Sequence, residues 1–173
     1  GHCMGADLSH VDQVTHLYNA MGAFSHRTQS TVVSALCNDN IYTEIIADGI
    51  HVQKDVLNIT FRTKPLNKII LISDALPITH SDKDSMDFCS KKVFLQNGKA
   101  VDSNGTIAGS TAFVSDIIKK LVHSSMLDLK TAVSMASSNL NYIPRQNAQI
   151  YWDNDFNISA MNLDGTMTVS YTH

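Results

Sequence analysis

Cysteine, blocks of like charge and long apolar runs are all scarce in this sequence. The cysteines are three, Cys3, Cys37 and Cys89, widely spaced and without a Cys-x-x-Cys pair. This usage argues against a disulfide framework and is typical of a reduced cytosolic protein. We therefore expect each cysteine to be a buried free thiol.

The distribution of charge and of apolar residues excludes further classes of protein. The net charge of −3 comes without a basic block or an acidic tail, so neither nucleic acid nor a membrane surface is an expected partner. The apolar runs are far too short to span a bilayer. The first residues do not combine a basic region with a following apolar one, as a secretory leader would. We expect a cytoplasmic protein.

The sequence does contain enough apolar material for a globular domain with a core, since 43% of its 173 residues are hydrophobic and 17% are charged. Three apolar segments, 14–17, 41–47 and 68–73, are predicted strands. The first ends at His16, the second at Asp48 and His51, and the third at Asp74. A parallel α/β protein places catalytic side chains at one rim in this way.

Helical patterns separate these strands. Apolar spacing predicts a short helix over 31–37 and another that begins at Asp55, so that β-α-β units follow one another. Residues 76–90 are expected to form a polar loop. A hairpin is predicted over 92–101, because Asn97-Gly98 suits a type I′ turn. A broad apolar face predicts a helix over 113–122, and Asp128 should cap the next one. Short strands are predicted over 149–152, 156–162 and 167–171.

Histidines and a carboxylate at or near the strand ends are candidates for chemistry. His2 and His16 could ligate a metal, although histidines on different elements are not a local motif and ordinary surface or capping roles remain open. Asp74 could act as a general base toward a metal-bound water, or cap the following turn. His51 could polarise a carbonyl, hold a sugar hydroxyl, or cap a helix.

Two further groups could bind an anion. Arg27 could grip a phosphate through its planar guanidinium, or be a solvated loop residue. Asn19 and the backbone at Ala20 could also serve an anion. Gly109 and Ser110 are expected to open a helix whose amides favour an anion or a polar substrate, with plain capping by Ser110 as the alternative.

Six segments occur in a fixed order: Gly1-His2, Thr15 to Met21, His26-Arg27, Ala47 to His51, Ser73-Asp74-Ala75, and Ile107 to Ser110. This series, over roughly residues 1–140, resembles the N-acetylglucosamine-6-phosphate deacetylases of the amidohydrolase superfamily. The resemblance implies an α/β fold, the C-terminal portion of a (β/α)8 TIM-type barrel of the metal-dependent hydrolases. Residues 1–145 would form the partial barrel with a hairpin insertion at about 92–106, and residues 146–173 the strands of a small sandwich.

The resemblance also implies roles for single residues. His2 and His16 would hold one divalent metal, zinc, and Asp74 would activate water and later protonate the leaving amine. The implied substrate-binding residues are Asn19, Ala20 and Arg27 at the phosphate, His51 near the acetamide, and Ile107, Ala108, Gly109 and Ser110 over the sugar. The implied reaction converts N-acetylglucosamine 6-phosphate to glucosamine 6-phosphate and acetate, in an enzyme that is a homodimer at full length.

The sequence departs from the family at the metal. The carboxylate ligand and the first strands of the barrel lie upstream in the family, in a part that this chain lacks, and three or four strands cannot close a barrel. We therefore expect impaired activity. A catalytically inactive fragment, or another amidohydrolase acting on a cyclic amide or a nucleobase, remains an alternative. The set of Asn19, Ala20 and Arg27 favours a phosphorylated sugar.

Overall fold

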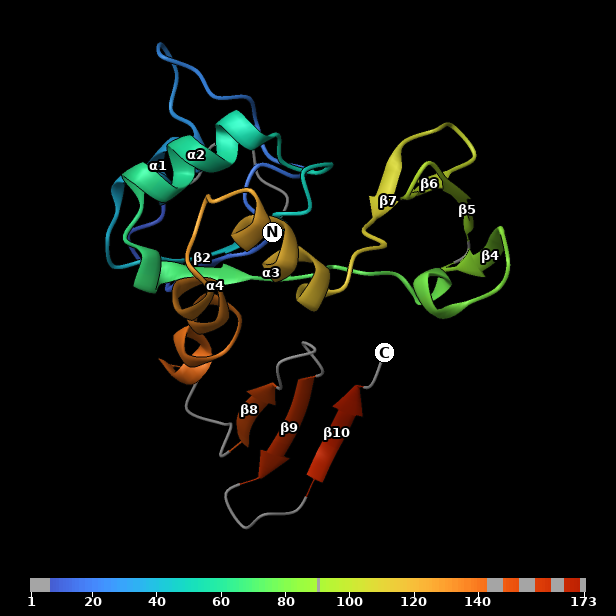
Figure 1. Cartoon of the computed structure of the whole chain (residues 1–173). Coiled ribbons are helices and arrows are strands. Elements are labelled where there is room, and N and C mark those ends of the chain that lie inside the picture. The colour runs from blue at the N-terminus through green and yellow to red at the C-terminus, as the bar shows by residue number, and fades with distance from the viewer. Residues whose placement is uncertain (1–6, 90, 143–147, 153–157, 163–166, 172–173) are drawn as a thin grey trace.

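The structure is a computed structural model, and it describes residues 7–89, 91–142, 148–152, 158–162 and 167–171. Its first sheet is parallel, with strands in the order β1 (Gln13–Val14), β2 (Tyr42–Ile45) and β3 (Ile69–Leu71). Helix α1 (Thr31–Cys37) lies between β1 and β2 in the chain. Helix α2 (Lys54–Thr63) and the 3-10 turn η1 (Leu66–Lys68) lie between β2 and β3 (Figure 1). The predicted β-α-β order is confirmed.

Apolar side chains on one face of this sheet pack against the helices. Ile45 and Leu71 pack with the buried faces of α3 (Val114–His123) and α4 (Leu129–Ala136). Val14 packs instead with Val32 and Leu36 of α1. Burial of such side chains contributes roughly 1.5–3 kcal/mol each. By the strand register these strand side chains lie on one face of the sheet, while β3 is buried at all three of its residues.

A buried lysine links the end of α2 to the end of α1. Lys64 is 2% exposed, and its Nζ donates to the carbonyl oxygens of Ala35 and Asn38 at 2.8 and 2.5 Å. Burial lowers the pKa of this amine. The ammonium thus binds carbonyl oxygens at the C-terminal end of α1, where the helix itself no longer supplies amide partners.

A second, antiparallel sheet follows, with strands in the order β4 (Ser85–Phe88), β5 (Lys91–Gln96), β6 (Lys99–Asp102) and β7 (Ile107–Gly109). Asn97 and Gly98 have φ of 50° and 72° between β5 and β6, which confirms the predicted hairpin. The expected polar loop over 76–90 is wrong, because the 3-10 turn η2 (Pro77–His80) and β4 lie there.

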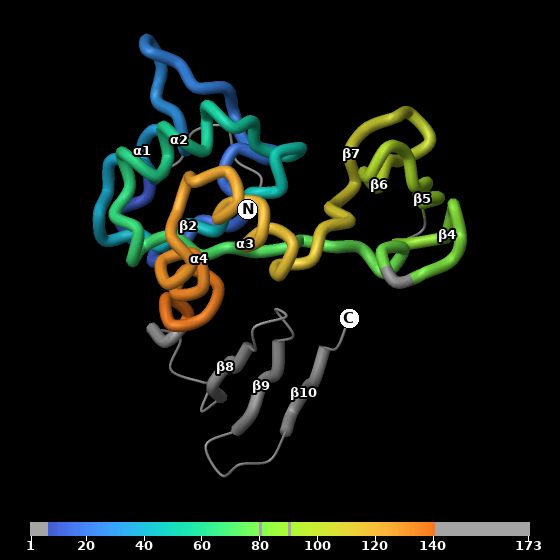
Figure 2. Tube along the Cα trace, viewed as in Figure 1, coloured from blue at the N-terminus to red at the C-terminus, as the bar shows by residue number. Residues whose placement is uncertain are grey.

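The chain leaves the parallel sheet after β3, builds the second sheet, and returns from β7 to α3 (Figure 2). Helix α3 begins at Val114, so the prediction that Gly109 and Ser110 open a helix is wrong: Gly109 ends a strand. The predicted cap of α4 is confirmed, since the Asp128 side chain accepts a hydrogen bond from the Thr131 amide at 2.9 Å.

The last described elements are η3 (Ser138–Tyr142) and an antiparallel sheet of β8 (Ala148–Trp152), β9 (Ile158–Asn162) and β10 (Met167–Tyr171), which confirms the predicted tail strands. Two cysteine predictions are wrong, because Cys37 and Cys89 are free but exposed, while Cys3 lies outside the described residues. Among the described helices, none combines the length and apolarity needed to cross a membrane.

Candidate functional site at the strand ends

The candidate site lies at the edge where the three parallel strands end. β1 and β3 both pair with β2, so their carboxyl ends share one edge. Backbone hydrogen bonds continue this pairing past the strands, from the Leu17 amide to the Glu44 carbonyl at 2.8 Å and from the Ile72 amide to the Ile45 carbonyl at 3.1 Å. His16 and Asp74 therefore lie at one rim, on either side of the end of β2.

The backbone at this rim is strained. His16, Tyr18, Ala20 and Asp74 have φ of 32°, 78°, 53° and 48°, in a left-handed region that costs a residue other than glycine roughly 1–2 kcal/mol. Such conformations persist where surrounding contacts enforce them, and they cluster at functional sites. One such contact is visible, because the Tyr18 hydroxyl lies 2.7 Å from Thr60 Oγ1 on α2. Burial raises the pKa of Tyr18.

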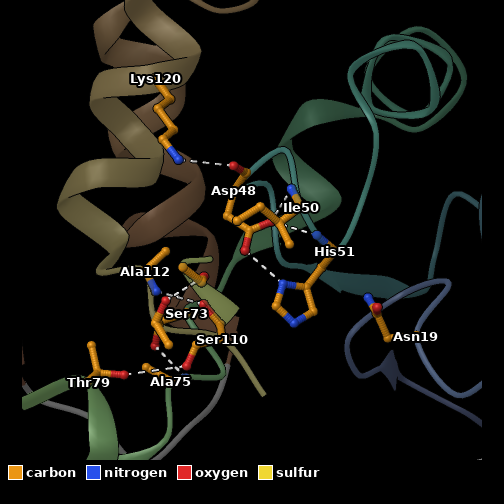
Figure 3. A network of polar contacts seen from close by, with 12 residues as sticks. Asn19, Asp48, Ile50, His51, Ser73, Ala75, Thr79, Ser110, Ala112 and Lys120 are labelled. Atoms are coloured by element: carbon orange, nitrogen blue, oxygen red, sulfur yellow. Dashed lines mark hydrogen bonds and ion pairs between the residues drawn. The ribbon is translucent and has the colours of Figure 1, made fainter. Parts of the chain in front are cut away.

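A single buried carboxylate organises the turn after β2. One oxygen of Asp48 accepts hydrogen bonds from the amides of Ile50 and His51, both at 2.8 Å, and the other lies 2.7 Å from His51 Nδ1 (Figure 3). The side chains of Asp48 and His51 are only 2% and 4% exposed. Lys120 of α3 donates to the Asp48 carbonyl at 3.2 Å. The turn is thereby fixed at both its side chain and its backbone.

The charge state of Asp48 follows from these contacts. Burial pushes the pKa of its carboxyl upward, but the hydrogen bonds from His51 and from the two amides outweigh that effect, so the pKa lies below its ordinary value. Asp48 is thus ionised at neutral pH. The second ring nitrogen of His51, Nε2, is buried and has no hydrogen-bond partner within the described residues.

Asp74 is held by the strand that returns from the second sheet. The Ser110 amide donates to the Asp74 carbonyl at 2.9 Å, and the Leu76 amide donates to the Ser110 carbonyl at 3.1 Å. A Cβ on Gly109 would lie 2.7 Å from Leu76 Cγ and 3.2 Å from the Asp74 carbonyl oxygen. Only glycine permits this close approach. The Asp74 residue itself stays exposed above it.

The four predicted sugar-covering residues fall into two pairs. Gly109 and Ser110 are buried, and Ser110 Oγ accepts from the Ala112 amide at 2.8 Å. Ile107 and Ala108 are exposed on β7. They line a hollow of about 290 Å³ on the second sheet, together with Phe88, Cys89, Lys91, Val93, Asp102 and Thr106. Of the four residues, Ile107 and Ala108 are therefore the pair accessible to a ligand.

The predicted phosphate-binding residues lie in the loop between β1 and α1. Arg27 is exposed, and its Nε donates to His26 Nε2 at 3.1 Å. Asn19 is half-buried, with Nδ2 donating to the Leu17 carbonyl at 3.3 Å, and Ala20 is exposed. The close view of the Asp48 turn also contains Asn19, whereas the described hydrogen bonds of Arg27 stay within its own loop (Figure 3).

Known proteins are similar to this chain in sequence over part of their length. The chain is 38% identical over 105 residues to the N-acetylglucosamine-6-phosphate deacetylase of Bacillus subtilis, covering 61% of this chain and 26% of that protein. It is 32% identical over 123 residues to the N-acetylgalactosamine-6-phosphate deacetylase of Shewanella sp., covering 71% of this chain and 31% of that protein. No protein-family model matches.

A solved structure decides the assignment. The crystal structure of the N-acetylglucosamine-6-phosphate deacetylase from Pasteurella multocida superposes with a TM-score of 0.74 at 28% identity, over 93% of this chain and 43% of that one. The chain is a homologue of the N-acetylglucosamine-6-phosphate deacetylases. It spans about a third or less of the length of the two curated relatives. The predicted resemblance to these deacetylases is confirmed.

The described residues alone do not complete the metal site that the deacetylase resemblance implies. His16 lies at the rim, but His2 is outside the described residues. Within residues 7–89, 91–142 and the three tail strands, no group of three or more histidine, cysteine, aspartate or glutamate side chains could hold a metal ion.

Two carboxylates that accept hydrogen bonds at or near the strand ends are not predicted as site residues by the sequence. The sequence pattern predicts Asp48 only as a strand end, although its spacing of three residues from His51 is a local signal. Glu44 of β2 accepts hydrogen bonds from Thr15 Oγ1, at 2.5 Å, and from the Gln13 side chain. No local signal reveals the second case, because strand pairing brings these residues together.

Proposed function

We propose that the chain contributes part of the active site of an N-acetylglucosamine-6-phosphate deacetylase, and that its parallel sheet is a portion of a (β/α)8 barrel. The single observation that carries the proposal is that His16, the Asp48–His51 turn and Asp74 all follow strands whose carboxyl ends share one edge. The homology to proteins of that name supports the choice of reaction.

The proposed chemistry is hydrolysis of an amide bond. Water forms a bond to the acetyl carbon, the bond between that carbon and the sugar nitrogen breaks, and acetate and an amine leave. Asp74 takes the proton from the attacking water and returns it to the departing nitrogen. Its exposed position at the rim, with the backbone held by Ser110, suits a base that must reach a bound substrate.

The phosphate is assigned to the loop between β1 and α1. Arg27 would pair with it through the guanidinium nitrogens, and Asn19 and the Ala20 amide would donate to it. His51 would hold the sugar or its acetamide, and Ile107 and Ala108 would lie over the sugar. Gly109 and Ser110 then act beneath the site, by holding Asp74.

Substrate comparison tests the proposal. Acetate release by the full chain should be faster with N-acetylglucosamine 6-phosphate than with unphosphorylated N-acetylglucosamine. The galactosamine epimer is included because one relative carries that name. Arg27→Ala should raise KM for the phosphorylated sugar about tenfold or more, whereas Arg62→Ala, on the exposed side of α2, should leave it unchanged. Equal KM values for both variants would refute the phosphate assignment.

The proposal extends to the metal, the location and the assembly of the protein. Zinc would be held by His2 and His16, a cytoplasmic location is expected, and a homodimer is expected for the full-length family. Metal analysis of the purified chain tests the first of these. An inactive chain, the alternative from the sequence, would bind the phosphorylated sugar without releasing acetate.

A further inference from the structure

The imidazole of His51 is held from one side only. Its Nδ1 lies 2.7 Å from the Asp48 carboxylate, and its Nε2 is buried without a hydrogen-bond partner in the described part of the chain. In Figure 3 the ring meets Asp48 through one nitrogen, and the other nitrogen points away from the turn. A buried polar atom without a partner is costly in a finished protein interior, so it calls for an explanation such as a ligand.

Backbone hydrogen bonds hold the Asp48 carboxylate in its contact with His51. Its second oxygen accepts two backbone amides at 2.8 Å, from Ile50 and His51, so the carboxylate cannot rotate without breaking them. The Lys120 ammonium holds the Asp48 carbonyl from α3. Gly49, at φ 79°, supplies the left-handed residue that closes the turn. The whole arrangement is therefore rigid before any ligand binds.

A carboxylate only accepts hydrogen bonds, so the Nδ1 atom that it contacts carries the proton. In the neutral imidazole the opposite nitrogen then presents a lone pair. We propose that Asp48 is a positioning residue that fixes the tautomer of His51, so that Nε2 accepts a hydrogen bond from a hydroxyl or an amide N–H of the bound sugar. The identity of the sugar rests on the proposed function, whereas the tautomer does not.

Nitrogen NMR of the full chain tests the tautomer without substrate. Two-bond proton–nitrogen correlations in a 15N-labelled sample distinguish a protonated Nδ1 from a protonated Nε2, and His51→Gln identifies the signal. We expect wild type to carry the proton on Nδ1. Asp48→Asn can present an amide N–H to Nδ1, so it should move the proton to Nε2. Asp82→Asn, an equal loss of charge in an exposed loop, should change nothing.

Two results would overturn the assignment. One is a wild-type His51 protonated on Nε2, and this needs no variant to fold. The other is an unchanged tautomer in Asp48→Asn. A purely structural role for Asp48 would lower stability and leave the tautomer of the folded molecules as it was.

Ligand titration then separates this inference from the proposed function. Asp48→Asn should weaken the binding of N-acetylglucosamine 6-phosphate about tenfold, the equivalent of one hydrogen bond, while Asp82→Asn binds as wild type does. Equal affinity of Asp48→Asn and wild type would refute the role of Asp48 in binding. If wild type binds no phosphorylated sugar, the proposed function fails, and the spectra still decide what Asp48 does to His51.

Discussion

Substitution of Gly109 by alanine tests the link between the two sheets. The added Cβ would meet Leu76 Cγ at 2.7 Å, Leu76 Cδ2 at 3.1 Å and the Asp74 carbonyl oxygen at 3.2 Å. Overpacking of this kind costs about 1–3 kcal/mol. Because the φ of Gly109 lies outside the left-handed region, alanine also stiffens the unfolded chain, which returns about 0.4–1 kcal/mol. The free energy of unfolding should therefore fall by about 1–2 kcal/mol.

A double-mutant cycle shows whether the loss comes from this contact. Leu76→Ala removes the two nearest side-chain atoms, so Gly109→Ala should cost about 1 kcal/mol less in that background. Gly105→Ala is the control, because its Cβ would meet nothing within 4 Å and its cost comes only from a φ of 78°. That cost should be the same with and without Leu76. Urea unfolding followed by circular dichroism measures all of these variants.

Two outcomes would contradict the reasoning. The first is a Gly109→Ala variant as stable as wild type. The second is additivity with Leu76→Ala, which would mean that the loss arises elsewhere. In the first case the close approach of Gly109 to Asp74 would not require glycine, and in the second case Leu76 would not be the source of the loss.

Three further predictions concern the strand-end turns. The folded-state pKa of Asp48 lies below its ordinary value of 3.8, so its stabilisation is present above that pH and is lost as the pH falls through the folded-state pKa. The stability advantage of wild type over Asp48→Asn, about 2 kcal/mol at pH 7, should shrink in acid, and a constant gap down to pH 2 would contradict this. Tyr18→Phe should lower the free energy of unfolding by about 1 kcal/mol through loss of the contact with Thr60, and no change would show that this contact is not stabilising. Ala20→Gly should raise it by about 0.5 kcal/mol, since φ at Ala20 is 53°, and a loss would argue against strain there.

Local signals were sufficient for the regular elements. The apolar runs before His16, before Asp48 and before Asp74 predicted three strands, and the structure pairs them in parallel. Asn97-Gly98 predicted a hairpin through the backbone conformation that its turn requires. In each case residues adjacent in sequence determine the structure, so sequence alone was enough.

The errors arose where distant segments pair. The first strand was predicted to reach Leu17, but it ends at Val14, because the chain turns at His16 before the Leu17 amide pairs with Glu44. The sequence does not predict strand β4, because only two of its residues, Met86 and Phe88, are apolar. These two pack against a cluster that includes Val93 of β5 and Ala100 of β6.

The candidate site also combines features that local sequence predicts with features that depend on distant segments. Its position at the strand ends could be predicted, because parallel strands share an edge. The burial of Ser110 beneath Asp74 could not be predicted, because it depends on a strand that returns after the whole second sheet. The contact between Asp48 and His51 does have a local signal, because the two residues are only three positions apart.

The most direct test of the central claim is acetate release from N-acetylglucosamine 6-phosphate by the zinc-supplemented chain, compared between wild type and Asp74→Asn. The two side chains have nearly the same shape, but the amide cannot take a proton from water. Asp82→Asn controls for the loss of charge. We predict measurable release by wild type and Asp82→Asn, and none by Asp74→Asn. Equal release by wild type and Asp74→Asn, or no release by wild type, would contradict the account.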